Sequence, residues 1–597
     1  MESEFRIHDM GRMPMLLYCR ARHGRAAVHR AMVAPPVASS PLTNAEIAQR
    51  LAGMAQLLSA QGENPYKIRA YRRAAETIRG LGESIDEQVR ADADLTRYAG
   101  IGKGIASALR EIVLSGKLGQ LELLMATVPP EVAELGDYPR LDPKRVLQAY
   151  KKLGIHSVPE LKARLEKGEI GKMFGARMEQ HFRNGLIETQ AMLLDDADPL
   201  AASIQRFLLE RCAAIRAETT GSTRRREETV SELAFVVETL GFPKLVESLA
   251  RYGGGLKRLG ADETSARFQL PAGITLRIEA APASKWGVTM VATTGSERHL
   301  EMMDPAGARL ARLAHGKTPY PDESSVYHAF GLALVPPELR EGNDELELAR
   351  RDALPKLVTL EDIRGELHAH TTSSDGALSI AEMAEAARER SYEYLGITDH
   401  SQSLKIAGGV SEEDLWKQIR LIDRLNEKLS GIRILKSSEV DILADGSLDY
   451  PDDLLAALDY TVCSIHSRFH LGKAEQTERV LRAMDNPHFT ILGHATGRLL
   501  LKRTGYELDF ERVIAHARAA GCFFEINASP DRLDLSPQNA RLVAQAGIRI
   551  AVCTDAHHGR ELDYLRCGID VARRAGLEKQ AVLNCLPLPR LLRAFRR

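Results

Sequence analysis

Between residues 364 and 557 the sequence alternates between short apolar runs and helical patterns, and most of the apolar runs end in a histidine or a carboxylate. The run 394–397 ends in Thr398-Asp399-His400, and the run 548–552 ends in Thr554-Asp555-Ala556-His557. This unit of strand, polar residue and helix occurs about seven times. Alternating strands and helices predict a parallel sheet. Closing such a sheet into a barrel would gather the polar strand ends at one mouth.

The other runs follow the same rule. His368-Ala-His370 alternates along a short strand, so both imidazoles face the same way, and Asp375 follows in a Ser-Ser-Asp-Gly turn. Further predicted strands are 432–435, which ends at Glu439; 460–465, which ends at His466; 489–492, which ends at His494; and 522–526, which ends at Asn527. The predicted helices span 379–390, 411–429, 475–485, 507–520 and 536–546. Ser379 with Glu382 and Ser411 with Asp414 are typical of helix N-termini.

The mouth of such a barrel would hold six imidazoles and three carboxylates. One ion needs about four to six ligands, so this set could hold two or three divalent metals. Mixed imidazole and carboxylate ligation suits Mn²⁺, with Zn²⁺ and Fe²⁺ as alternatives, better than Ca²⁺. A single strand-end histidine is more often a core or capping residue, but nine such residues together are hard to explain in that way. The candidate ligands are His368, His370, Asp375, His400, Glu439, His466, His494, Asp555 and His557.

Adjacent divalent ions are suited to the cleavage of phosphate esters, because they neutralise charge on the phosphate oxygens. Arg498 and Arg532 also lie just past predicted strand ends. Either guanidinium could bind a phosphate bidentately, and a surface ion pair is the alternative for each. We therefore take both arginines as candidate catalytic residues.

The chain as a whole has the composition of a folded protein. Its 597 residues are 44% hydrophobic and 27% charged, and no apolar run approaches the roughly 18 residues of a membrane span. A net charge of −1 argues against a dedicated nucleic-acid coating protein but leaves room for one domain that contacts phosphates. Seven scattered cysteines without a Cys-x-x-Cys pair favour reduced thiols in a cytosol.

The N-terminal part divides in two. Residues 1–40 carry six arginines and end in a Pro/Ala/Ser-rich run, for which we expect a disordered basic extension or sequence upstream of the true start. From residue 41 the pattern is helical, and Asn44 could cap a helix that carries Ile47, Leu51, Met54 and Leu58. A glycine-rich turn then opens another helix, and its backbone N–H groups could face a phosphate, although a plain turn between helices is the alternative. The turn contains Gly100, Gly102, Lys103 and Gly104.

With these motifs in hand, residues 361–597 resemble a PHP (polymerase and histidinol phosphatase) domain. The matching motifs are His368-Ala-His370-Thr-Thr-Ser-Ser-Asp375-Gly, Thr-Asp-His400-Ser, Glu439-Val-Asp, Ser-Ile-His466-Ser, Leu-Gly-His494 and Thr-Asp555-Ala-His557. The resemblance implies a distorted (βα)7 barrel with a trinuclear metal site. All nine candidate ligands match that family's set.

Residues 41–345 resemble the polymerase core of bacterial family X DNA polymerases, some of which are fused to a PHP domain. Residues 98–106 resemble the helix-hairpin-helix of its DNA-end-binding domain, and Gly221-Ser-Thr-Arg-Arg-Arg-Glu-Glu-Thr229 resembles its palm motif. The resemblance implies a multidomain chain with an N-terminal all-α domain, an α/β nucleotidyltransferase-like region and a C-terminal barrel. The implied divisions are 41–130 for DNA-end binding, 131–198 for fingers-like helices, 199–345 for palm and thumb, 346–362 for a linker and 363–597 for the PHP domain.

The palm motif departs from that family at the carboxylates that hold two catalytic Mg²⁺ ions. The family reads Gly-Asp-x-Asp, where this chain has Glu232 and Ala234, and Arg277 stands at the third carboxylate position. Alanine offers no oxygen ligand and arginine repels a cation. We therefore expect a degenerate polymerase site. Arg140 and Asp142 replace glycines of a second hairpin, whose phosphate-binding turn we also expect to be lost.

Together these features predict a metal-dependent phosphodiesterase that acts on DNA ends in repair, as a 3′-5′ exonuclease, with a polymerase-like region that binds DNA without nucleotidyl transfer. The expected partner is gapped, nicked or 3′-ended DNA, in a bacterial cytoplasm near the nucleoid and away from membranes. Three alternatives stay open: an active template-directed polymerase, a small-molecule phosphatase, and a noncatalytic scaffold for DNA ends.

Overall fold

The computed structural model describes residues 41–61, 63–119, 157–175, 191–270 and 273–596, together with residues 121, 148, 152–155, 178–179 and 182–183. The predicted extension 1–40 and the second hairpin with Arg140 and Asp142 lie outside the described residues. Within the described part, no helix has both the length and the apolar surface needed to span a bilayer.

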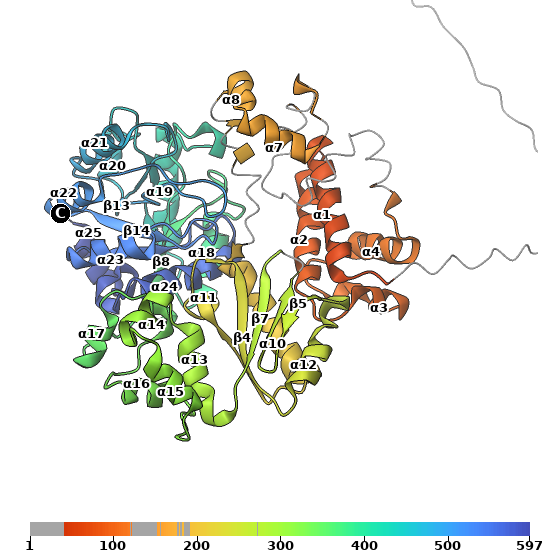
Figure 1. Cartoon of the computed structure of the whole chain (residues 1–597). Helices are drawn as coiled ribbons and strands as arrows, with labels where there is room; N and C mark the ends of the chain where they lie inside the picture. Colours follow the sequence, from red (N-terminus) through yellow and green to blue (C-terminus); the bar gives the residue numbers. More distant parts are fainter. Residues whose placement is uncertain are drawn as a thin grey trace, which may run out of the picture. The chain divides into compact units, whose positions relative to one another are not determined.

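The N-terminal helices pack around one apolar core (Figure 1). The stripe predicted from the sequence lies on the first helix, where Ile47, Leu51 and Met54 are fully buried. Two short helices, α7 (Val158–Glu166) and α8 (Glu169–Phe174), follow further along the chain. The four N-terminal helices are α1 (Asn44–Gln61), α2 (Pro65–Arg79), α3 (Ile85–Arg90) and α4 (Lys103–Ser115).

Asn44 does not cap α1, so that prediction was wrong by one residue. Thr43 is the cap: its Oγ1 accepts the N–H of Glu46 at 3.3 Å, and the Glu46 carboxylate accepts the N–H of Thr43 at 2.8 Å. The buried amide of Asn44 instead donates to the Glu83 carbonyl and accepts the Ile85 N–H, each at 2.8 Å. Asn44 therefore joins α1 to the segment that begins α3.

The central region is built on a five-stranded mixed sheet with the order β2-β4-β7-β6-β5. Only β4 and β7 are parallel neighbours in this sheet. Helices α10 (Leu194–Arg211) and α12 (Phe242–Leu249) share an apolar core with the sheet. The strands are β2 (Arg216–Thr220), β4 (Glu232–Glu238), β5 (Lys257–Ala261), β6 (Ser265–Gln269) and β7 (Thr275–Ala280). The pair β1 (Met192–Leu193) and β3 (Thr229–Val230) and the short helix α11 (Gly221–Arg224) complete the region.

A second group of helices follows this sheet around a separate core. A buried polar network lies inside it: His299 Nδ1 is 2.7 Å from a Glu345 carboxylate oxygen, and its Nε2 is 2.9 Å from the Tyr327 hydroxyl. Both ring nitrogens are thereby satisfied without solvent. The helices are α13 (Trp286–Thr294), α14 (Glu297–Met303), α15 (Ala308–His315), α16 (Glu323–Ala329) and α17 (Glu345–Arg350).

The C-terminal region is a ring of parallel strands, as the sequence predicted. One sheet has the order β10-β9-β8 and the other β11-β12-β13-β14-β15. A parallel bridge between Ala369 and Ala556 joins β8 to the segment after β15. At the other seam, the predicted strand 432–435 corresponds to β10, and Ser437 and Ser438 separate it from a further short strand, β11, which begins at Glu439. The strands are β8 (Gly365–Ala369), β9 (Tyr394–Ile397), β10 (Arg433–Lys436), β11 (Glu439–Asp441), β12 (Val462–Ser464), β13 (Ile491–Leu492), β14 (Phe523–Asn527) and β15 (Ile550–Cys553).

The five predicted helices correspond to α18, α19, α21, α22 and α23, which begin and end within three residues of the predicted bounds, whereas α20, α24 and α25 were not predicted. The predicted caps are confirmed: Ser379 and Glu382 form a reciprocal capping box, and Ser411 accepts the N–H of Asp414. The helices are α18 (Ile380–Glu389), α19 (Glu412–Asn426), α20 (Asp452–Leu455), α21 (Lys473–Met484), α22 (Phe510–Ala520), α23 (Pro537–Gln545), α24 (Leu565–Arg574) and α25 (Leu588–Phe595).

Ion pairs join the central region to the barrel. Arg226, which follows α11, lies 2.7 Å from carboxylate oxygens of both Asp198 in α10 and Asp570 in α24. Arg573 in α24 lies 2.8 Å from Glu338. A guanidinium shared by two half-buried carboxylates is a stronger link than an exposed pair, since solvent screens it less.

Arg479 of α21 provides a test of how the barrel is held together. Its side chain is 1% exposed, contacts the buried carbonyl of Ile442, and donates to the carbonyls of Leu443 at 2.8 Å and Ser467 at 3.0 Å. Each buried carbonyl left without a donor costs about 1–3 kcal/mol, so Arg479→Met should lower the melting temperature of the protein clearly. The exposed Arg482 of the same helix is the matched control, and Arg482→Met should leave the melting temperature unchanged. Equal melting temperatures for the two variants would contradict this.

Candidate metal centre at the mouth of the barrel

Strand ends deliver all nine candidate ligands to one end of the barrel. His368 lies in β8, and His370 follows it directly; Glu439 is the first residue of β11. Each of the others follows a strand or lies in the adjoining turn, as the sequence predicted. The result is a cluster drawn from most of the strands of the ring, a geometry that barrels use for active sites.

Three overlapping groups within the cluster have ligand atoms that all lie within 4.8 Å of one another. Two groups share His370 and two share His400, so the groups adjoin one another. His494 belongs to none of the three but lies 2.8 Å from Glu439 through its Nε2. The groups are His370, Asp375, His400 and His557; His368, His370 and Asp555; and His400, Glu439 and His466.

Glu439 lies at the centre of the cluster, where one buried carboxylate faces five imidazoles. Its exposed fraction is 1%. The distances from its oxygens to ring nitrogens are 3.5 Å for His368, 3.6 Å for His370, 2.8 Å for His400, 3.3 Å for His466 and 2.8 Å for His494. A carboxylate in this position can bridge neighbouring cations.

Many of the ligand atoms have no hydrogen bond within the described protein, which fits a metal site. Such atoms are rare in folded proteins, where buried polar groups are normally paired. Metal ions would supply the missing partners, and mixed imidazole and carboxylate donors suit transition metals. The buried atoms without a hydrogen bond are His368 Nε2, both ring nitrogens of His370, His400 Nδ1, His494 Nδ1 and Glu439 Oε2. Of these, His400 Nδ1 and Glu439 Oε2 face each other at 2.8 Å as an ion pair.

The electrostatics of the metal-free cluster agree with this reading. Burial by itself would raise the pKa of Glu439, but the surrounding histidines, His466 foremost, hold it well below its ordinary value. Burial likewise opposes ionisation of Asp555, yet His368 and His370 hold its pKa well below the ordinary value. Burial and the neighbouring His400 lower the pKa of His370 to about 4. Glu439 and Asp555 are therefore ionised, as cation binding requires. In contrast, neighbouring carboxylates outweigh burial and raise the pKa of His466 to about 10 and that of His557 to about 9, so a bound cation would displace protons from these two rings.

Sequence reasoning missed the residues that orient these ligands. Glu525, on β14, accepts a hydrogen bond from His494 N at 2.7 Å and lies 2.6 Å from His368 Nδ1. Asp441 contacts His466 Nδ1, and Asn527 Nδ2 donates to Asp555 at 3.1 Å. Carboxylates behind metal-binding histidines fix the ring orientation and tautomer. The sequence signal that could have identified them is their spacing: Asp441 lies two residues after Glu439 in β11, and Glu525 lies two residues before Asn527 in β14, so each pair faces the same side of its strand.

Two ligand positions have backbone that L-residues rarely adopt. The φ angle is +23° at His494 and +54° at Asp555. Positive φ costs of order 1–3 kcal/mol at such a residue and is retained where the surrounding structure enforces it. Here the strand ends turn sharply, and the turn directs both side chains into the cluster.

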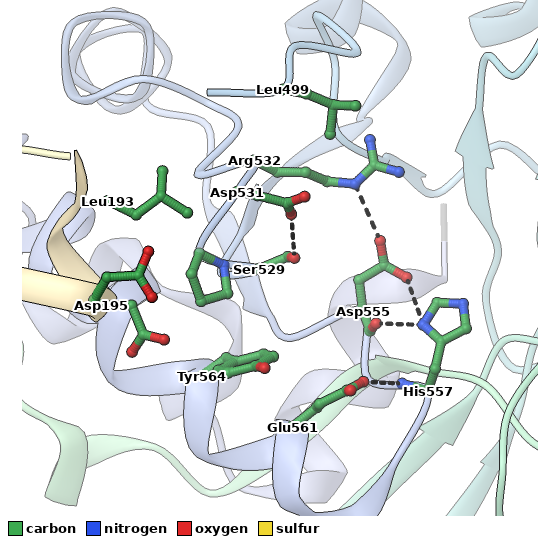
Figure 2. Close-up of a pocket in the computed structure, with 12 residues that line it drawn as sticks. Leu193, Asp195, Leu499, Ser529, Asp531, Arg532, Asp555, His557, Glu561 and Tyr564 are labelled. Atoms are coloured by element: carbon green, nitrogen blue, oxygen red, sulfur yellow. Dashed lines mark hydrogen bonds and ion pairs between the residues drawn. The ribbon is translucent and has the colours of Figure 1, made fainter. Parts of the chain in front are cut away.

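The two candidate arginines have different surroundings. Arg532 lies at the cluster, with its Nε 3.6 Å from Asp555 (Figure 2). Arg498 does not present a free guanidinium: its Nε donates to the Arg532 carbonyl at 3.0 Å, and another nitrogen contacts Glu228 and the Leu533 carbonyl. The structure therefore favours the ion-pair alternative for Arg498. Arg498 holds in place the loop that carries Arg532.

The three palm positions singled out from the sequence meet on two adjacent strands. Ala234 of β4 pairs in register with Arg277 of β7. The Arg277 guanidinium lies 2.8 Å from Glu232 and 3.1 Å from Glu279. Arg277 therefore places a cationic side chain at the position where the resemblance to the polymerase family predicts a metal-binding carboxylate.

The glycine-rich turn of the N-terminal domain opens α4. Gly100 has a φ of +82°, and a Cβ there would lie 3.0 Å from the Arg73 side chain, so both backbone and space favour glycine. Gly102 is the N-cap of α4 without a side-chain cap, and Gly102, Lys103 and Gly104 are exposed. The first N–H groups of the helix thus face solvent beside a lysine, an arrangement that favours an anion.

Comparisons with known protein families identify a domain in the N-terminal part of the chain and another in the C-terminal part. The helix-hairpin-helix domain family matches residues 42–118, and the PHP domain family matches residues 366–529. The DNA polymerase/3′-5′ exonuclease PolX of Bacillus subtilis (strain 168) is 34% identical over 564 residues, which cover 91% of this chain and 97% of that protein. A probable phosphatase of Thermoanaerobacter sp. (strain X514) is 31% identical over 230 residues, 37% of this chain and 89% of its own length. A probable phosphatase of Syntrophotalea carbinolica is 28% identical over 230 residues, again 37% of this chain and 90% of its own length.

Fold and site together define a multidomain protein in which a helix-hairpin-helix domain and a nucleotidyltransferase-like sheet precede a PHP barrel with a candidate polynuclear metal centre. The match over nearly the whole length makes the assignment more specific. The chain belongs to the family of the DNA polymerase/3′-5′ exonuclease PolX proteins.

Metal binding should be visible in thermal stability. After removal of bound metal with a chelator, Mn²⁺ added at 100 times its dissociation constant should stabilise the wild type by about 2.7 kcal/mol, read as a rise in melting temperature. The double variant His368→Ala/His370→Ala should lose most of that rise. His516→Ala, at an α22 histidine that pairs with Asp485, is the control and should keep it. An equal rise in the double variant would show that the cluster does not hold the metal.

Proposed function

We propose that the chain is a metal-dependent phosphodiesterase that removes nucleotides from DNA 3′ ends as a 3′-5′ exonuclease in repair. The observation that carries the proposal is the convergence of nine ligand-type side chains, several with unpaired buried atoms, in a chain of this family. The proposed divisions of the chain are 41–130, 131–198, 199–345, 346–362 and 363–597.

In this proposal the nine residues hold two or three divalent ions, with Mn²⁺ as the first choice and Zn²⁺ and Fe²⁺ as alternatives. When bound, the ions would supply positive charge to the scissile phosphate and favour ionisation of the attacking water. Hydrolysis adds one water: its oxygen joins phosphorus, the P–O3′ bond breaks, and a proton ends on O3′. Arg532 lies beside Asp555 and is placed to bind a non-bridging phosphate oxygen.

DNA is the proposed substrate because of the domain that precedes the barrel. The exposed N-terminus of α4 and Lys103 would bind backbone phosphates without reading sequence. Gapped, nicked or single-stranded 3′ ends are the proposed DNA forms. This domain favours DNA over a small phosphomonoester, although the probable phosphatases matched by the barrel make the phosphatase function the second candidate.

We further propose that the nucleotidyltransferase-like region binds DNA but does not transfer nucleotides. The support is the ion pair of Glu232 with Arg277 and the alanine beside it, which leave too few oxygens for two Mg²⁺ ions. The Bacillus relative is named as a polymerase as well as an exonuclease, which supports the alternative that this chain also transfers nucleotides. Nucleotidyl transfer therefore needs a direct test.

The nuclease assignment predicts a loss of activity that follows the metal centre. His368→Ala/His370→Ala should reduce Mn²⁺-dependent release of nucleotides from a 5′-labelled, single-stranded DNA by at least about 100-fold, because two of the shared ligands are removed. The control His516→Ala should retain wild-type rates. The readout is the ladder of shortened products on a denaturing gel. Unchanged release in the double variant would refute the assignment.

Loss of nucleotidyl transfer is tested by primer extension. The purified protein with a primer-template, deoxynucleotides and either Mg²⁺ or Mn²⁺ should give no templated product, since the palm lacks the carboxylates that would hold two ions. To prevent degradation of the primer, the His368→Ala/His370→Ala variant is the form to assay. Templated extension that disappears on Glu232→Gln would overturn the proposal and establish a working palm.

A further inference from the structure

A cavity of about 570 Å³ opens beside the candidate metal centre (Figure 2). Asp555, His557 and Arg532 line one side of it, and Leu193 and Asp195 of the central region line another. Cavities of roughly 300–1,000 Å³ are the size that holds a small ligand or one unit of a polymer. The cavity therefore has room for a group attached to a phosphate at the metal centre.

Part of the lining is apolar. Leu193, Leu499, Pro530 and Tyr564 contribute to the wall, and each is only partly exposed. Figure 2 shows the Tyr564 ring and the Leu193 side chain on the cavity wall away from the metal centre. Aromatic and aliphatic surfaces of this kind bind the face of a nucleobase, and they do so with little regard to which base it is.

Apart from Arg532 and His557 beside the metal centre, the charged part of the lining is acidic. Asp531 is engaged by Lys502 at 2.8 Å and Glu561 by the His557 N–H at 2.9 Å. Asp196 is exposed and has no hydrogen-bond or ion-pair partner within the described residues. Such a lining repels a second phosphate, whereas a free carboxylate accepts hydrogen bonds from sugar hydroxyl or base amino groups. The chemistry of the cavity is thus that of a nucleoside site rather than a phosphate site.

Ion pairs connect the cavity wall formed by the start of α10 to helix α24 of the barrel. Asp195 pairs with Arg566 of α24, and Asp198 lies 3.3 Å from the same guanidinium. Arg226 joins Asp198 to Asp570 of the same helix, each at 2.7 Å. The start of α10 is therefore held against α24, and the cavity is completed by residues that a barrel alone would lack.

We propose that this cavity binds the nucleoside of the terminal nucleotide, with its base against Leu193 and Tyr564, while the scissile phosphate lies at the metal centre. The inference rests on the proposed exonuclease function and specifies its substrate. A base can enter only after it leaves its neighbours, so unpaired 3′-terminal nucleotides are preferred over paired ones. In this proposal the nucleotidyltransferase-like region contributes one wall of the nuclease substrate site.

The test compares two single-stranded DNAs that differ only at the 3′ end, one with terminal thymidine and one with a terminal abasic sugar analogue. The wild type should release thymidine nucleotide with kcat/KM about tenfold higher, since one stacked base contributes on that order. Tyr564→Ala should reduce this ratio to near one, mainly through KM, and Tyr564→Phe should restore it. Leu499→Trp, which fills the cavity, should also reduce the ratio.

The outcomes separate the two claims. If the wild type releases nothing from either DNA in Mn²⁺, the exonuclease function fails and the subsite fails with it. If the wild type releases both at the same rate, or if Tyr564→Ala keeps the tenfold ratio, the subsite is refuted and the exonuclease function stands. The Mn²⁺-induced rise in melting temperature of Tyr564→Ala should equal that of the wild type, which shows that the variant is folded and its metal centre intact.

Discussion

The buried carboxylate of Glu439 is the interaction on which the barrel's chemistry depends. An ionised group in the interior costs several kcal/mol unless partners compensate it, and five imidazoles face this one. The histidines lie in or just after four different strands, β8, β9, β12 and β13, so these strands must assemble side by side before all five imidazoles can surround Glu439. The break between β10 and β11 at Ser437 and Ser438 serves this end, since β11 then begins at Glu439 itself.

The candidate ligands are oriented by neighbouring carboxylates whose oxygens are occupied by hydrogen bonds. Glu525 spans two ligands, because one oxygen lies by the His368 ring and the other accepts the backbone N–H of His494. Asp399 accepts hydrogen bonds from Thr371 and Ser374, in the turn that carries Asp375. These contacts settle the orientation of the rings before metal binds, which reduces the entropy lost on binding.

The palm-like motif has become part of the connection to the barrel. Arg226 pairs across to Asp570, and Glu228 contacts Arg498, which in turn holds the carbonyls of Arg532 and Leu533. A segment that resembles a polymerase palm motif thus supports the loop beside the metal centre. This gives a physical reason for a nucleotidyltransferase-like region to keep its fold if its own metal site is lost.

Sequence alone predicted the barrel and the residues that gather at its mouth, because the period of the strands and the position of each polar residue at a strand end are local properties. The helix bounds and the caps at Ser379 and Ser411 followed from the same local rules. Tertiary structure decided the rest. Arg498 and Arg532 occupy similar places in the sequence, and only the surrounding carbonyls and Glu228 distinguish the supporting residue from the one at the cluster. Asn44 was likewise assigned to a cap because its contacts with Glu83 and Ile85 are long-range. The cavity between Leu193 and Tyr564 could not be predicted from the sequence, since its walls lie hundreds of residues apart in the chain and are brought together by tertiary contacts, among them the ion pairs between α10 and α24.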